Sequence, residues 1–327
     1  MKTRLLMTIS AAMLTLAGCT NEDQVEAVDN WNGEIRLTSG VTTQTRANTQ
    51  ATQILESETV YAWADKVSAT TDYIKAWTLT AGSSNDFTGN SQYYPTDGSN
   101  LDFYALHGNF APGTFTENTT VFPASAIVHS VEADQSGTDM KNYAKSDLLY
   151  AVQKNVARSK DAVQLPFYHM LSKVEVALKS GNGNPNLAGA TVTIVGTKLK
   201  ADFTPDKSAT MTEQSARAGM IAINGSNNNA APITIRTVTT TDFSGNTEYG
   251  EAVVLPNQTI SQNTPFIQVK LANNAVFSYK IPDTGGLTLE SGKKYTYKIT
   301  VNQSGLTVTS TIEDWTSEVK TGNAEMD

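Results

Sequence analysis

The fold class of this chain is set by one stretch near its C-terminus, residues 292–315, which reads GKKYTYKITVNQSGLTVTSTIEDW. Apolar and polar residues alternate from residue 295 to 301, and again from 306 to 312. A period of two is typical of a strand that buries one face. The four residues between the two runs, 302–305, include a glycine and suit a hairpin loop. The stretch therefore predicts two antiparallel strands.

The same alternation recurs along most of the chain, with turn signals between the segments. Further candidate strands are residues 34–41, 59–63, 101–105, 145–152, 163–167, 174–178, 192–194, 199–203, 267–271 and 275–281. Because the run 145–152 is almost continuously apolar, we expect that strand to be covered on both faces. Consecutive short strands with tight turns predict an all-β protein whose antiparallel sheets pack as sandwiches.

A change in pattern near Leu165 divides the chain into two parts. The length of 327 residues suits about two domains, each able to bury its own core. We therefore predict one β-sandwich over residues 47–165 and a second over residues 166–327. The net charge is −8 and basic runs are missing, which argues against nucleic acid as a partner, since phosphate binding needs clustered Lys and Arg.

The first eighteen residues have the order of a secretion signal. Lys2 and Arg4 precede an apolar run over residues 5–16, which is too short to remain as a membrane helix. The run ends in Leu-Ala-Gly-Cys, and Cys19 is the only cysteine of the chain. This ending resembles a bacterial lipobox, in which the cysteine is lipidated and becomes the new N-terminus. The alternative is an ordinary signal peptide with a cysteine nearby by chance.

The residues after Cys19 predict a tether, a strand and a loop. An acidic stretch at 20–23 resembles a surface-export signal, although acidic tethers can also be solvated linkers. In the candidate strand 34–41, Ile35, Leu37 and Val41 fall on one side. The polar, unpatterned residues 42–50 follow and suit an exposed loop.

Groups that could carry catalysis or bind a metal are few. The three histidines, His107, His129 and His169, do not have the spacing of a helical zinc motif, and we expect each to be a surface or partly buried structural residue. We expect no metal, no cofactor and no enzymatic activity. Four aromatic residues could stack on sugar rings, although core packing is the more common use of such residues in a sandwich. They are Trp63, Trp77, Tyr93 and Tyr94.

Several segments together resemble the fimbrillin family, the subunits of Bacteroidetes-type (type V) fimbriae, and its Mfa-like branch in particular. The order and spacing of these segments, over nearly the whole mature chain, carry the resemblance. They read YYP at 93–95, LDFYA at 101–105, SDLLYA at 146–151, LPFYHMLSKVEV at 165–176, GKKYTY at 292–297 and TIEDW at 311–315.

The resemblance implies two tandem transthyretin-like β-sandwich domains and export to the outer membrane as a lipoprotein. It also implies that an arginine-specific protease removes an N-terminal segment that includes a strand of the first domain. A neighbouring copy or related subunit then donates a strand to the vacated groove, giving a polymer that supports adhesion to host or bacterial surfaces and biofilm formation. In this chain, residues 19–46 would be the removable segment, with cleavage between Arg46 and Ala47.

Elementary chemistry agrees with this scheme. A sheet that loses a strand presents unpaired N–H and C=O groups, which an incoming strand satisfies. Exposed polar loops such as 42–50 are preferred sites of proteolysis, although Arg46 could also be a plain surface arginine in a linker. The tail after Trp315 has few apolar residues. Either the strand 306–315 contributes to the donor, or the tail is a weakly patterned donor, or the subunit caps or anchors the fibre.

The sequence also allows two rival functions. The first is a permanently lipid-anchored surface protein that binds glycans through its sandwich loops. In that case the lipid on Cys19 persists and Arg46→Ala has no assembly phenotype. The second is a surface hydrolase with a dispersed site, whose turnover would depend on a histidine or a carboxylate.

Overall fold

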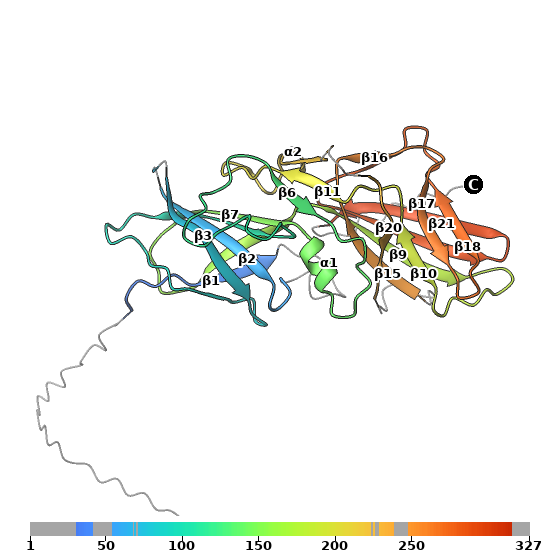
Figure 1. Cartoon of the computed structure of the whole chain (residues 1–327), viewed down its shortest axis with the longest axis horizontal. Helices are drawn as coiled ribbons and strands as arrows, with labels where there is room; N and C mark the ends of the chain where they lie inside the picture. The colour runs from blue at the N-terminus through green and yellow to red at the C-terminus, as the bar shows by residue number, and fades with distance from the viewer. Residues whose placement is uncertain are drawn as a thin grey trace, which may run out of the picture. The chain divides into compact units, whose positions relative to one another are not determined.

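The computed structural model describes residues 31–41, 54–67, 69, 71–223, 225, 229–238 and 248–315. Within these ranges the chain forms 21 strands and two short helices, α1 (Lys141–Ser146) and α2 (Gln214–Gly219) (Figure 1). The predicted all-β class is confirmed. No helix in this part of the chain is long and apolar enough to cross a membrane.

The largest sheet has seven strands in the order β1-β8-β7-β5-β2-β3-β4. All neighbours are antiparallel except β1 and β8, which run parallel. The strands are β1 (Leu37–Val41), β2 (Thr59–Lys66), β3 (Asp72–Ala81), β4 (Phe87–Gly89), β5 (Leu101–His107), β7 (Leu149–Val156) and β8 (Val163–His169).

At the centre of this sheet, in β2, β5 and the first half of β7, both faces are buried, which explains the nearly continuous apolar run that begins at Leu148. Register places Ala62, Ala105 and Ala151 on one face, which we call the inner face. On the opposite face, Trp63 and Tyr104 belong to the large hydrophobic cluster that extends through the rest of the chain.

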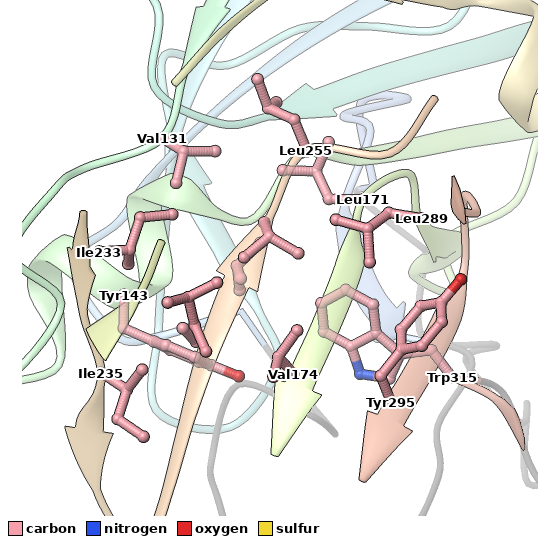
Figure 2. Packing of buried hydrophobic residues seen from close by; sticks show 14 of the residues in the cluster. Val131, Tyr143, Leu171, Val174, Ile233, Ile235, Leu255, Leu289, Tyr295 and Trp315 are labelled. Atoms are coloured by element: carbon pink, nitrogen blue, oxygen red, sulfur yellow. The ribbon is translucent and has the colours of Figure 1, made fainter. Parts of the chain in front are cut away.

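A five-stranded and a four-stranded sheet form a sandwich in the second half. The five-stranded order is β14 (Arg236–Thr237), β15 (Glu248–Val254), β9 (Ser172–Ser180), β20 (Lys293–Asn302) and β21 (Gly305–Asp314). The four-stranded order is β13 (Ile233–Thr234), β10 (Thr191–Ile194), β17 (Pro265–Lys270) and β18 (Val276–Lys280). Figure 2 shows part of this core, including Val174 on β9 and Tyr295 on β20, which are register partners.

Two small sheets complete the described fold. One is three-stranded, β12 (Ile221–Ile223), β11 (Lys200–Phe203) and β6 (Ile127–Ser130), and the other pairs β16 (Gln258–Ile260) with β19 (Leu287–Leu289). The chain passes from the seven-stranded to the five-stranded sheet through Met170 and Leu171, both fully buried. Strand β6 pairs with β11, so hydrogen bonds also join segments on either side of Leu165.

The C-terminal hairpin is confirmed, because β20 and β21 pair in register down to Asn302 and Gly305. One predicted element is wrong at its start. Lys145 and Ser146 end helix α1, and strand β7 begins only at Leu149. The Ser146 hydroxyl donates to the carbonyl of Asn142, four residues back, within the last turn of this helix. The apolar pattern of 145–152 did not reveal this turn.

Candidate functional site: the seat of strand β1

Strand β1 lies beside β8, in parallel register from Leu37 opposite Val163 to Val41 opposite Phe167. The Val163 N–H donates to the carbonyl of Arg36 over 2.8 Å. Strand β8 is therefore hydrogen-bonded along both of its sides, to β1 on one side and to β7 on the other.

The opposite side of β1 is also occupied, by the chain around β4. The Ser39 N–H donates to the Asn85 carbonyl over 2.7 Å, and the Ile35 N–H to the Gln92 carbonyl over 2.8 Å. The N–H of Tyr94 in turn donates to the carbonyl of Gly33 over 2.9 Å. Strand β4 is the last strand of the sheet and β1 is the first. The hydrogen bonds from β1 to the chain around β4 therefore connect the two ends of the strand order. We call the position between β8 and residues 85–94 the β1 seat.

Apolar side chains fill the inner face of this seat. Ile35 and Leu37 are 3% exposed, while Leu165 and Phe167 on β8 are fully buried. The ring of Phe87 on β4 meets that of Phe167 edge to face, with centroids 6.2 Å apart. Taking β1 away would leave an apolar groove with unpaired backbone groups along both sides, which is the property of an open sheet edge that binds strands.

The sequence-based site residues are placed as follows. Ile35 and Leu37 share the inner face, and Val41 pairs with Phe167 through its backbone. Cys19, Arg46 and Ala47 lie outside the described residues. The removal of the strand and the cleavage site remain predictions. Sequence reasoning missed the pairing of β1 with residues 85–94, because that segment is rich in turn signals and carries no strand alternation.

The three histidines are fully buried, more deeply than the sequence suggested. His107 has its ring nitrogens 3.0 and 3.1 Å from the carbonyl oxygens of Thr59 and Ala144. His129 places Nε2 3.0 Å from the carbonyl oxygen of Ser146, and burial lowers its pKa to about 4. This ring is therefore neutral at pH 7 and donates from Nε2.

His169 lies where the two large sheets meet. Its Nδ1 is 2.8 Å from the Asp147 carboxylate, with both side chains almost fully buried. Its ring stacks on the indole of Trp315, with centroids 3.8 Å apart and planes inclined by 12°. The end of β21 is thus packed against the end of β8. In the part of the chain that the structure describes, no group of three His, Cys, Asp or Glu side chains could hold a metal ion.

Most of the aromatic residues considered for sugar stacking belong to the core. Trp63, Trp77 and Tyr94 are at most 4% exposed, whereas Tyr93 is 42% exposed. The Trp63 indole N–H donates to the carbonyl of Thr120 over 2.9 Å, as a buried indole requires. Three of the four are therefore unavailable to a glycan.

The fold and this seat define a β-sandwich protein whose first described strand is paired on both of its sides. A family model described as fimbrillin-like matches residues 45–315, most of the chain. The chain therefore belongs to the fimbrillin-like family, which consists of structural subunits of cell-surface fimbriae rather than enzymes.

Individual relatives agree with this assignment. The proposed fimbrium subunit Fim1C of Bacteroides uniformis is 24% identical over 339 residues, covering 99% of this chain and all of that protein. A crystal structure of a proposed cell adhesion protein from Bacteroides uniformis superposes with a TM-score of 0.57 at 19% identity, covering 87% of this chain and 100% of that one. Another from Bacteroides ovatus gives 0.55 at 18% identity, covering 88% and 98%. At these identities the two structures support the fold alone.

Proposed function

We propose that this chain is a fimbrial subunit that is exported as a lipoprotein and assembles by strand exchange. In this scheme Cys19 carries the lipid that holds the precursor at the outer membrane. An arginine-specific protease cuts between Arg46 and Ala47, residues 19–46 leave together with β1, and another subunit donates a strand to the vacated seat. The mature chain would then comprise two transthyretin-like sandwiches, over residues 47–165 and 166–327.

The observation that carries this proposal is the hydrogen bonding of β1 on both of its sides. An ordinary edge strand pairs on one side only. The segment 33–41, which contains β1, pairs on both: the Arg36 carbonyl accepts from the Val163 N–H on one side, and the Gly33 carbonyl accepts from the Tyr94 N–H on the other. Loss of β1 would therefore leave donors and acceptors unpaired along two edges, above the buried Leu165 and Phe167. Only another strand can pair with the backbone groups along both edges and fill the apolar groove at the same time. The vacated seat would therefore favour binding a strand from another subunit.

Donation between subunits would give a fibre. The donor and the seat are different surfaces of the molecule, so the contact is heterologous and need not close into a ring. Such an assembly grows head to tail. The partners implied are other copies of this chain or related fimbrial subunits, with a host or bacterial surface ligand as the target of adhesion.

Limited digestion tests the proposal. Residues 19–327 carrying Cys19→Ser would be treated with an arginine-specific protease, the new N-terminus sequenced, and the products sized by gel without boiling. We expect cleavage between Arg46 and Ala47 followed by ladders of denaturant-resistant polymers. Arg46→Lys should abolish both results. Arg36→Lys is the matched control, since Arg36 belongs to the backbone-paired segment and should not be the site that is cut.

Other outcomes separate the alternatives. A clean cut without ladders would mean that the subunit caps or anchors the fibre and needs the strand of a different subunit. If residues 42–50 resist the protease altogether, strand exchange by this route is wrong. A permanently lipid-anchored, glycan-binding surface protein would then be the better assignment.

A further inference from the structure

One lysine from the second half of the chain lies between two carboxyl groups of the first half. Lys207, in the loop 204–208, places its Nζ 2.6 Å from Asp65 on β2 and 2.8 Å from Asp72 on β3. The two aspartates are register partners, directly opposite each other on neighbouring strands. The fold therefore brings one amine and two carboxyl groups together, although Lys207 and Asp65 are 142 positions apart in the sequence.

Aromatic rings limit the access of water to this amine. The ring centroids of Tyr104 and Phe122 each lie 4.9 Å from Lys207 Nζ. The side chains of Asp65 and Asp72 are 12% and 7% exposed, while that of Lys207 is 31% exposed and lines a cleft of about 920 Å³. An amine that is largely shielded and lies beside a base is the arrangement that activates a lysine as a nucleophile.

The two carboxyl groups differ in their other contacts. Asp72 also accepts the backbone N–H of Phe122, and a hydrogen bond of this kind favours the ionised form of an acid. Asp65 Oδ1 is buried and, among the described residues, accepts no hydrogen bond. Burial raises the pKa of Asp65 and outweighs the opposing effect of Lys207. This site therefore favours a protonated Asp65 beside an ionised Asp72.

A second lysine between two carboxylates lacks this feature. Lys173 Nζ lies 2.8 Å from both Glu175 and Glu251. Each of these acids has a further cation, because Arg236 lies 3.3 Å from Glu251. Lys294 likewise lies 3.7 Å from Glu175. Two cations beside each acid favour the carboxylate, which as an anion repels a nucleophile, so we expect a stable ion pair at Lys173.

We propose that Lys207 and Asp65 form an intramolecular isopeptide bond, with Asp72 as the group that transfers protons. The Lys207 ammonium first gives a proton to the Asp72 carboxylate. The neutral amine then forms a bond from Nζ to Cγ of the protonated Asp65. The bond from Cγ to the hydroxyl oxygen breaks, and Asp72 donates its proton to the departing hydroxyl and takes one proton from the nitrogen. The products are one amide, one water molecule and a protonated Asp72.

The fold supplies the condition that makes this condensation possible in water. Reactive groups held in contact and well oriented reach effective molarities of about 10⁵–10⁸ M, which offsets the mass action of water against amide formation. The bond would join the loop 204–208 to β2, and so tie the second half of the chain to the first. In a fibre it would resist tension that separates the halves. The inference does not depend on strand exchange, so the two can fail separately.

Mass spectrometry of the denatured protein, residues 19–327 carrying Cys19→Ser, tests the proposal. The parent should be lighter than its sequence by one water molecule. Lys207→Arg should have its full mass, because a guanidinium group stays protonated and does not attack. Asp72→Ala should also have its full mass, since the proton carrier is lost. Lys145→Arg is the matched control and should keep the mass loss, because Lys145 pairs with Glu132 at the surface.

A tryptic digest of the parent locates the bond without any variant. Trypsin does not cut after an acylated lysine, so residues 201–217 should appear as a branched peptide joined to residues 47–66. The peptide that ends at Lys173 should stay linear in the same digest. Loss of water by cyclisation at Asp97–Gly98 would also lower the mass, but it would leave every peptide linear.

Three results would overturn the proposal. The first is a parent of full mass after prolonged incubation of the folded protein. The second is a digest in which residues 47–66 and 201–207 are both linear. The third is a branched peptide that carries residues 67–75 in place of 47–66, which would make Asp72 and not Asp65 the group that is attacked.

Discussion

Buried polar side chains join parts of this chain that are distant in sequence. His129 contacts the carbonyl of Ser146 at the end of α1, and Lys207 bridges Asp65 and Asp72. The two aspartates are directly opposite each other on β2 and β3, where like charges repel, so Lys207 offsets their repulsion. None of these contacts could be predicted from sequence, because histidine, lysine and aspartate spacing carries no information on long-range pairing.

The buried His129 should make the stability of the protein depend on pH. Its pKa is about 4 in the folded state, against an ordinary value of about 6.5. The unfolded chain therefore binds more protons between these values. Stability should be fully present above pH 6.5 and should fall as the pH approaches 4, by about 3 kcal/mol from this residue.

Denaturant unfolding at several pH values measures this effect. His129→Gln keeps a side-chain N–H donor for the Ser146 carbonyl but cannot titrate. The difference in unfolding free energy between parent and variant should therefore change between pH 6.5 and pH 4 and stay constant above pH 7. A difference that does not change with pH would show that His129 titrates normally.

The secondary structure divides into elements that the sequence predicts and elements that it does not. The hairpin of β20 and β21 was predictable, because alternation and a glycine-containing loop are local signals. Inward-facing Ile35 and Leu37 were predictable for the same reason. The parallel pairing of β1 with β8 was not, since the partners are more than a hundred residues apart and register depends on the assembled sheet. Nor did alternation reveal the bulge in β3, where Lys75 and Ala76 together oppose the single residue Trp63 of β2.

The inner face of β1 should hold that strand in its seat. Leu37→Asp places a charge among buried apolar side chains and should lower the free energy of unfolding by about 3 kcal/mol or more. Arg36→Asp also adds a negative charge, but at the neighbouring exposed position, and should change stability by less than about 0.5 kcal/mol.

Guanidinium unfolding of both variants, followed by tryptophan fluorescence, measures the comparison. Equal stability of Leu37→Asp and Arg36→Asp would mean that the inner face of β1 contributes little. In that case burial of Ile35 and Leu37 could not be the reason why β1 stays in place before cleavage.

At the scale of the whole molecule, the proposed assembly would use the β1 seat between β8 and residues 85–94. Family membership and an all-β fold agree with a surface fibre subunit. Local sequence patterns were enough to predict the all-β fold class, whereas the predicted leader and cleavage site lie outside the described residues and stay predictions. The pairing of β1 on both of its sides could not be predicted, because it arises from tertiary packing.

Hydrogen exchange at two backbone amides tests the central claim most directly. The N–H groups of Val163 and Tyr94 donate to the carbonyls of Arg36 and Gly33, which lie just before β1, on opposite sides of the seat. Both should be protected in the uncleaved protein, exchange rapidly in the cleaved monomer once the 19–46 fragment is removed, and regain protection in the polymer. Continued protection in the separated monomer, or rapid exchange in the polymer, would contradict vacancy and refilling of the β1 seat.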